Sequence, residues 1–135
     1  MSRNSFPTDV LELAAELVSR PSRNTMGHAR PDGTQKEFAL WLAELLASMG
    51  ASQVQTTEPG EGLMNVFAAF DFGCEETVVY TAHLDTVPPM SGPHDHWFGQ
   101  TQENCLWGRG VCDDNGPMAA MLAAIAQERP ALIYL

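Results

Sequence analysis

The chain has 135 residues, a length typical of one domain, with 17 acidic and 7 basic side chains and a formal net charge of −10. This excess of negative charge repels phosphate backbones and anionic lipid headgroups, so it disfavours nucleic-acid and membrane-surface partners. The N-terminus lacks a signal-peptide core, the longest apolar run (118–126) is too short to span a membrane, and the three cysteines form no Cys-x-x-Cys pair. We therefore expect a cytoplasmic protein with neither a disulfide framework nor a thiolate zinc site.

Two amphipathic helices are expected in the N-terminal part of the chain. Thr8 is a suitable N-cap for the first helix, whose apolar residues repeat at helical spacing until Pro21. The second helix begins at Thr34, which opens a Thr-x-x-Glu capping box, and ends at Gly50. The loop between them contains His28, which we interpret as a solvated residue rather than a ligand. The apolar faces of both helices are expected to cover a sheet.

The middle of the chain changes to strand periodicity. Strands are expected over 52–57, 63–70 and 77–84, with turns at 60–62 and 71–73 between them. The third segment is continuously apolar until its polar end, which predicts a strand buried on both faces.

Residues 86–103 are expected to form a long polar loop, and loops of that length are often functional. The loop contains His94-Asp95-His96, which has the residue types of an adventitious metal site. We interpret this tripeptide as exposed loop residues instead. Trp97 is given no chemical role.

A short strand at 105–107 is expected to lead into Gly108-Arg109-Gly110. This is not a dinucleotide-binding loop, because Asp113 occupies the third glycine position. A helix over 118–128 follows. Residues 131–135 then indicate another buried strand, and since a bare apolar strand edge invites aggregation, we expect the chain to be cut there.

Two segments carry the chemistry. In the first, an apolar run from Val78 ends in His83-Leu84-Asp85-Thr86-Val87-Pro88. Because successive side chains of a strand alternate between faces, His83 and Asp85 project to the same side. A carboxylate in that position can hold an imidazole in one tautomer while a metal takes the other ring nitrogen. The second segment reads Gly108-Arg109-Gly110-Val111-Cys112-Asp113-Asp114-Asn115-Gly116-Pro117.

This pair of motifs resembles the zinc-dependent M20 metallopeptidases and deacylases. That family includes acetylornithine deacetylase, succinyl-diaminopimelate desuccinylase, aminoacylase and carboxypeptidase G-type enzymes. The resemblance implies an α/β fold, with a mixed, largely parallel sheet covered by helices, as in zinc-peptidase and phosphorylase/hydrolase-like catalytic domains. It covers essentially the whole chain, so that residues 1–135 correspond to the N-terminal portion of the family's catalytic domain. The rest of that domain and the lid and dimerisation domain would be absent.

Amide hydrolysis at neutral pH needs an activated water and a group that stabilises the oxyanion, and two zinc ions supply both. By the resemblance, His83 is a terminal zinc ligand and Asp113 is the carboxylate that bridges two Zn²⁺, with Co²⁺ or Mn²⁺ as alternatives. Asp85 is the catalytic residue that orients His83. Relatives also suggest a cis peptide bond between Asp113 and Asp114.

The sequence departs from the family pattern at two places. Residue 115 is Asn where many members have Lys, and Asn115 or Gly116 then serves as the cap of the following helix. The chain also stops before the Glu-Glu motif that supplies the general base and a ligand, and before the later carboxylate and histidine. We therefore expect the isolated chain to be inactive. Cys112 is interpreted as a buried packing thiol rather than a nucleophile or ligand.

The leading hypothesis is a fragment of an amidohydrolase that cleaves N-acyl amino acids or short peptides, with a homodimer as one form of the complete enzyme. The Gly-Arg-Gly-x-Cys-Asp segment and the loop Asn24-Thr25-Met26-Gly27 look most like the deacetylase and desuccinylase branch. The alternative is a natural truncation or pseudoenzyme that acts as a weak metal-binding or assembly module. A related co-catalytic aminopeptidase family fits the Gly-Arg-Gly segment poorly.

Overall fold

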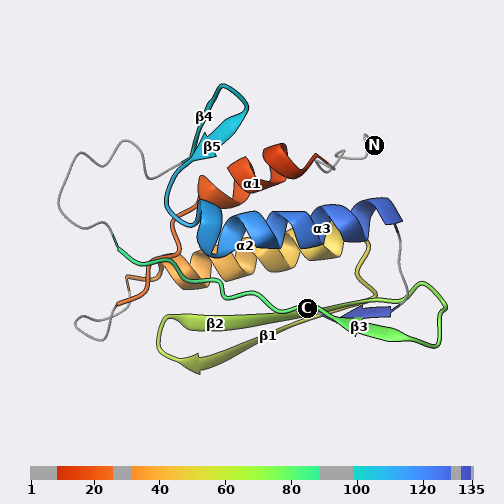
Figure 1. The fold of residues 1–135 in the computed structure, drawn as a ribbon. Coiled ribbons are helices and arrows are strands. Elements are labelled where there is room, and N and C mark those ends of the chain that lie inside the picture. Colours follow the sequence, from red (N-terminus) through yellow and green to blue (C-terminus); the bar gives the residue numbers. More distant parts are fainter. Residues whose placement is uncertain (1–8, 26–31, 89–98, 129–131, 135) are drawn as a thin grey trace, which may run out of the picture.

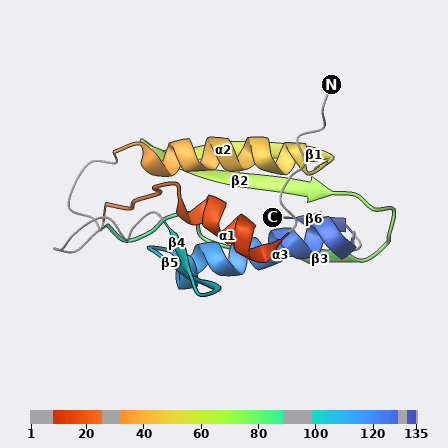
Figure 2. The ribbon, with the colours of Figure 1, turned by 90° about the horizontal axis from the view of Figure 1, so that it is seen from above.

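The computed structural model describes residues 9–25, 32–88, 99–128 and 132–134. Figure 1 shows a sheet with the three helices on one side of it and a small hairpin at one end of the helical layer. The helices are α1 (Val10–Val18), α2 (Thr34–Ser48) and α3 (Gly116–Glu128). As Figure 2 shows from above, α2 lies over β1 (Gln53–Gly60) and β2 (Leu63–Phe70), and α1 packs against α3.

The four-stranded sheet has the order β1-β2-β6-β3, where β6 is Leu132–Tyr134 and β3 is Thr77–Val79. The expected largely parallel sheet is wrong: β1–β2 and β2–β6 are antiparallel, and β3–β6 alone is parallel in the described sheet. The tight turn between Gly60 and Leu63 permits only an antiparallel pair. The connection from β3 to β6 contains α3, and a parallel pair needs such a crossover.

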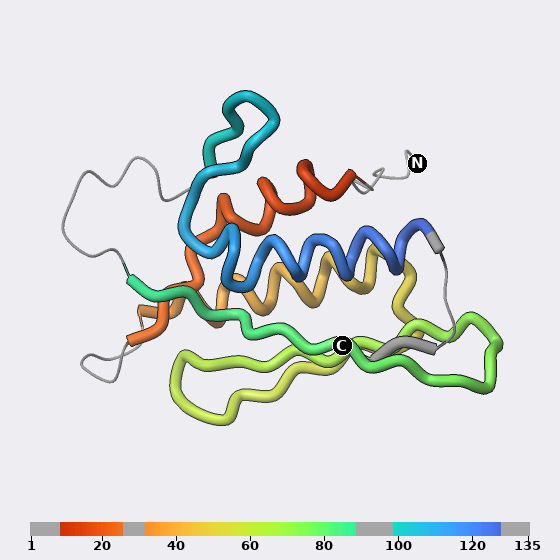
Figure 3. Tube along the Cα trace, in the orientation of Figure 1, coloured from red at the N-terminus to blue at the C-terminus, as the bar shows by residue number. Residues whose placement is uncertain are grey.

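The strand expected over 77–84 ends at Val79. Residues 80–84 continue in the same direction, as the trace in Figure 3 shows, but belong to no strand. Burial on both faces is also wrong, because Val78 and Val79 are 41% and 63% exposed. Within the described residues, β6 alone pairs with β3, and its partners end at Val79. A strand is buried on both faces when layers cover both faces of its sheet, whereas the described helices lie on one side of this sheet.

The start of α1 is capped by Asp9 rather than by Thr8, which lies outside the described residues. The Asp9 carboxylate accepts hydrogen bonds from the backbone N–H groups of Leu11 and Glu12, at 2.9 and 3.0 Å. Two of the N–H groups that a helix leaves unpaired are thereby satisfied, and the negative charge lies at the positive end of the helix dipole.

The capping box expected at Thr34 is also wrong. The N-cap of α2 is Gly33, with φ +86°, and Thr34 is the first helical residue. The Thr34 hydroxyl donates to Asp32 Oδ1 at 2.7 Å and accepts from the backbone N–H of Arg23 at 2.9 Å. Thr34 therefore ties the loop after α1 to the start of α2.

The core lies between the helices and the sheet. Its fully buried members are Leu13, Ala14, Leu17, Phe38, Leu42, Leu46, Ala68, Phe70, Met118, Ala119, Leu122, Ala123 and Ile125. The expected apolar stripe of α2 is confirmed at Phe38 and Leu42, while Trp41, Leu45 and Met49 are partly buried against the same core. The buried amide of Gln35 joins α2 to β2, because it both donates to and accepts from the backbone of Met64. In the described part of the chain, no helix has the length and apolar character needed to cross a membrane.

The hairpin of β4 (Gln100–Gln102) and β5 (Cys105–Trp107) was predicted only in its second strand. β4 falls within the expected loop 86–103, and its polar sequence gave no strand signal. The turn residues Glu103 and Asn104 have φ of 51° and 61°, which gives the tight reversal of a two-residue hairpin. The interpretations of His28, His94–His96 and Trp97 concern residues outside the described ranges.

Candidate metal centre

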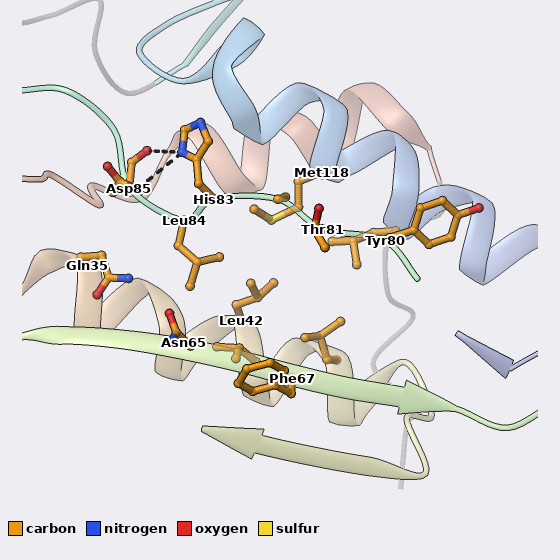
Figure 4. Close-up of a pocket in the computed structure, with 14 residues that line it drawn as sticks. Gln35, Leu42, Asn65, Phe67, Tyr80, Thr81, His83, Leu84, Asp85 and Met118 are labelled. Atoms are coloured by element: carbon orange, nitrogen blue, oxygen red, sulfur yellow. Dashed lines mark hydrogen bonds and ion pairs between the residues drawn. The ribbon is translucent and has the colours of Figure 1, made fainter. Parts of the chain in front are cut away.

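The structure brings together the two residues expected to bind metal. His83 Nε2 lies 2.7 Å from Asp113 Oδ1, although the two residues are 30 positions apart. His83 lies at the end of the extended segment after β3, as Figure 4 shows, and Asp113 lies in the turn before α3. An imidazole and a carboxylate that converge in this way are both typical zinc donors.

The other ring nitrogen of His83 is held by Asp85. His83 Nδ1 lies 2.9 Å from the backbone carbonyl oxygen of Asp85 and 3.6 Å from its Oδ1. The backbone carbonyl of Asp85 makes the hydrogen bond to the ring, whereas the carboxylate that was expected to do so is beyond hydrogen-bond distance. Because a carbonyl only accepts, Nδ1 carries a proton and Nε2 faces Asp113.

The pKa of His83 is raised above its ordinary value. The main cause is the hydrogen bond to Asp113, with smaller contributions from the carbonyl and charge of Asp85 and the charge of Asp113, while partial burial acts in the opposite direction. Both ring nitrogens face oxygen acceptors, so the doubly protonated imidazolium is favoured. A metal at Nε2 would have to displace this proton.

Asp113 is positioned by an unusual piece of backbone. It lies in η2 (Val111–Asn115), a single wide turn in which Asp113 has φ −150° and ψ 88°. The Asp113–Asp114 peptide bond is cis, so that expectation is confirmed. The Asp113 side chain is 86% exposed, which leaves its carboxylate accessible from the solvent.

Asn115 is the buried residue of the same turn. Its side chain is buried, and its backbone N–H donates to the carbonyl of Gly110 at 2.8 Å. A Cβ at Gly110, where φ is +83°, would lie 2.8 Å from Asn115 Nδ2 and 2.9 Å from a Thr86 methyl. Asn115, which stands where many M20 members have Lys, thus has a buried side chain and does not line the cavity that contains His83 and Asp113.

Asn24 is a site residue that the sequence did not single out, except as part of a loop. Its Nδ2 donates to Asp85 Oδ2 at 2.7 Å, across 61 positions of sequence. Nothing in the sequence pairs these two residues, because the contact depends on how the loop after α1 folds back. Figure 3 shows this loop beside the end of segment 80–88.

The side chains of the candidate site line one cavity of about 410 Å³. Its lining includes Asn24, His83, Asp85, Arg109, Cys112 and Asp113. The expectation of a buried Cys112 is wrong, because the thiol is exposed. In the η2 turn the buried position is taken by Asn115, which leaves Cys112 and Asp113 facing the solvent.

The residues present fit a metal ion, but they are few. His83 Nε2 and Asp113 Oδ1 are the two donors that converge, and His83 is oriented through its second nitrogen as in many zinc sites. Among the residues that the structure describes, no group of three or more His, Cys, Asp or Glu is arranged to hold a metal. The described chain therefore offers part of a coordination shell.

Comparisons with known proteins show which family this chain resembles. Residues 79–133, which contain both motifs, match the sequence model of peptidase family M20/M25/M40. Succinyl-diaminopimelate desuccinylase from Halorhodospira halophila is 37% identical over 123 residues, which is 85% of this chain and 28% of the relative. The enzyme of that name from Stenotrophomonas maltophilia is 33% identical over 125 residues, or 87% of this chain and 29% of the relative.

Two solved structures share the fold. The M20 family metallo-carboxypeptidase Sso-CP2 from Sulfolobus solfataricus gives a TM-score of 0.75 at 20% identity, over 94% of this chain and 30% of that one. Human carnosine dipeptidase 1 gives 0.70 at 21% identity, over 93% and 30%. The fold and the two motifs are thus similar to those of M20 family proteins, and the expected resemblance to that family is confirmed. The chain spans about 30% of the length of these relatives.

Proposed function

We propose that this chain forms the N-terminal portion of the catalytic domain of a zinc-dependent amidohydrolase that cleaves N-acyl amino acids or short peptides. The observation that carries the proposal is the convergence of His83 Nε2 and Asp113 Oδ1 in one cavity, at 2.7 Å. The similar proteins include a desuccinylase and a dipeptidase, whose substrates have an amide bond next to an amino-acid unit.

Each of the three residues has one role. His83 Nε2 and the Asp113 carboxylate would hold the metal, with Asp113 as the carboxylate shared between two ions, while Asp85 holds the imidazole. A bound Zn²⁺ lowers the pKa of its water and polarises the substrate carbonyl, and Co²⁺ or Mn²⁺ are alternatives. The carbonyl of Asp85 fixes the ring plane of His83 before the metal arrives, and the exposed Asp113 carboxylate presents its oxygens to the cavity.

A groove beside the site supports the view that more of the domain lies elsewhere in the complete protein. It has a volume of about 290 Å³ and runs between β2 and residues 80–85, over α2 and α3. Figure 4 shows Phe67, Tyr80 and Met118 around it. β6 enters one end, since Tyr134 pairs with Ala69 on one side and Val79 on the other.

In that register, a strand that continued β6 would pass between Phe67 and Thr81 and reach the level of His83. We propose that such a strand, with later parts of the complete protein, supplies the general base and the remaining ligands. On this proposal the 135-residue chain alone is inactive, and the complete enzyme is cytoplasmic and forms a homodimer through a lid domain.

The test is hydrolysis by the complete protein loaded with Zn²⁺, with N-succinyl and N-acetyl amino acids and dipeptides as substrates. We expect turnover that falls to background in His83→Ala and Asp113→Ala and is kept in His28→Ala. Absence of hydrolysis of every one of these substrates would contradict the proposal.

The second candidate is a pseudoenzyme or natural truncation that acts as a weak metal-binding or assembly module. The small number of donors in the described residues favours it. It predicts weak Zn²⁺ binding, abolished by His83→Ala, with no turnover even in the complete protein.

A further inference from the structure

The loop after α1 contacts Asp85 at two different groups. Thr86 N–H donates to the carbonyl of Ser22 at 2.8 Å, and this N–H belongs to the same peptide group whose carbonyl accepts from His83 Nδ1. The side chain of Asp85 is held separately, by the Asn24 amide at 2.7 Å. The loop therefore fixes both the peptide plane and the carboxylate of the residue that orients His83.

The loop itself is well anchored. Asn24 N–H donates to the carbonyl of Thr86 at 2.9 Å, which closes a short parallel bridge around Arg23 and Thr86. Arg23 N–H donates to the hydroxyl of Thr34, at the first turn of α2. These main-chain bonds do not involve the side-chain amide of Asn24. We therefore expect the loop to keep its place when that side-chain amide is removed.

The chemistry of the contact defines its direction. An ionised carboxylate only accepts, so the Asn24 amide presents its N–H₂ to Asp85 Oδ2. With Oδ2 held, Oδ1 faces the ring of His83 at 3.6 Å. A carboxylate without this bond would be free to rotate into the cavity, where it would compete with Asp113 for a metal or with the Asp85 carbonyl for the ring N–H.

We propose that Asn24 is a positioning residue of the metal centre: it holds the Asp85 carboxylate in the orientation that keeps His83 ready to bind metal through Nε2. This inference rests on the proposed metal-binding function. It gives the loop after α1 a role in a site whose motifs lie 61 positions further along the chain.

The test is a double-mutant cycle on Zn²⁺ affinity, measured by competition with a fluorescent chelator. Partners that orient a ligand typically contribute about 10-fold to 100-fold to metal affinity, so we expect Asn24→Ala to weaken binding about 10-fold. If Asn24 acts through Asp85, the same change has no effect in an Asp85→Ala background. Multiplicative effects of the two changes would overturn the proposal, as would an unchanged affinity in Asn24→Ala.

Asn104→Gly is the matched control. It removes an asparagine amide from the β4–β5 turn, at a φ of 61° that glycine adopts readily, and it should bind Zn²⁺ like the parent chain. Circular dichroism on all variants checks that they are folded. Asp85→Ala breaks the same hydrogen bond from the other side and serves if Asn24→Ala does not fold.

A second readout needs no metal. The ¹⁵N shifts of the His83 ring, recorded at a pH where the ring is neutral, give the fraction of molecules with the proton on Nδ1. We expect Asn24→Ala to lower that fraction, and Asp85→Ala to lower it with no further change in the double variant. If the complete protein binds no Zn²⁺, the proposed function fails, while the Nδ1-protonated fraction still decides the role of Asn24: an equal fraction in the parent and in Asn24→Ala overturns that role.

Discussion

The two arms of the candidate centre are held in place by different means. His83 lies on an extended segment outside the described strands, and it is fixed by a hydrogen bond to Asp85, which a distant loop holds in turn. Asp113 lies in the η2 turn, where close packing of side chains around Gly110 and of backbone around Gly116 sets its position. Hydrogen bonds can be removed one at a time with graded effects, whereas a packed turn tolerates no added atom. The Asp113 arm should therefore be the more sensitive to substitution.

The largest effect is expected for Gly116→Ala. Its Cβ would lie 2.1 Å from the backbone oxygen of Val111, so the turn or the start of α3 has to move. Overpacking of this kind costs about 3 kcal/mol, measurable as a lower urea midpoint. Gly60→Ala is the control: its Cβ would meet Leu63 at an ordinary 3.6 Å, and stability should stay within about 1 kcal/mol. Equal midpoints for the two variants would show that the η2 turn is not tightly packed.

Gly110→Ala should come next. It combines a φ of +83° with contacts of 2.8 and 2.9 Å to Asn115 and Thr86. Gly73→Ala has a similar φ of +77° but nothing within 4 Å, so it isolates the backbone cost of about 1–2 kcal/mol. We expect Gly110→Ala to destabilise the chain by more than Gly73→Ala in urea unfolding, and to weaken Zn²⁺ binding as well. If both substitutions lower the free energy of unfolding equally, the close contacts with Asn115 and Thr86 do not contribute to the loss of stability.

A smaller effect is expected on the pKa of His83, which depends on its contact with Asp113. Asp113→Asn removes the main cause of the raised pKa, so the His83 titration followed by NMR should move to lower pH. A raised folded-state pKa stabilises the fold fully below the unfolded value of about 6.5, and the contribution is lost as pH rises through the folded value. The stability gap between parent and Asp113→Asn should therefore be present in mildly acidic buffer and disappear at alkaline pH. A stability difference between the parent and Asp113→Asn that increased with pH would contradict a stabilising contact between His83 and Asp113.

The smallest effect concerns Cys112, which lies beside Asp113 in the exposed part of the turn. Bound Zn²⁺ should slow alkylation of Cys112 several-fold, because the thiol lines the cavity that holds the metal donors. Cys74 and Cys105 are also exposed but lie outside that lining, and they provide internal controls in the same mass spectrum. Equal protection of all three thiols would indicate direct binding of zinc to cysteine instead.

The site residues that lie in short sequence motifs could be predicted from the sequence. His83, Asp85 and Asp113 were identified because two local patterns resemble one family, and the structure places them together. Asn24 was not identified as a site residue, since its partner is 61 positions away and a loop asparagine has many uses. Cys112 was assigned to the interior because small residues fill this position in the family it resembles, but Asn115, three residues further on, is the buried residue of the turn.

The fold was predictable to a similar depth. The positions of α1, α2 and β2 followed from periodicity and from stop signals such as Gly50, whose φ is +98°. Strand direction did not follow, because it depends on which strands become neighbours rather than on any one strand's sequence. The short β3 shows a related limit: its apolar residues predict a strand buried on both faces, but the described helices lie on one side of the sheet, and Val78 and Val79 are exposed.

The one-sided arrangement in Figure 1 has a consequence for how the molecules behave in concentrated solution. The helices cover one face of the sheet, and exposed apolar side chains of the strands include Leu63, Phe67, Val78 and Val79. Between copies of a chain with net charge −10, electrostatic repulsion opposes contact through these side chains. The repulsion reaches about 10 Å at 0.1 M salt and about 3 Å at 1 M. Added salt should therefore weaken the repulsion that opposes contact through these side chains, whereas dilute buffers keep the copies apart.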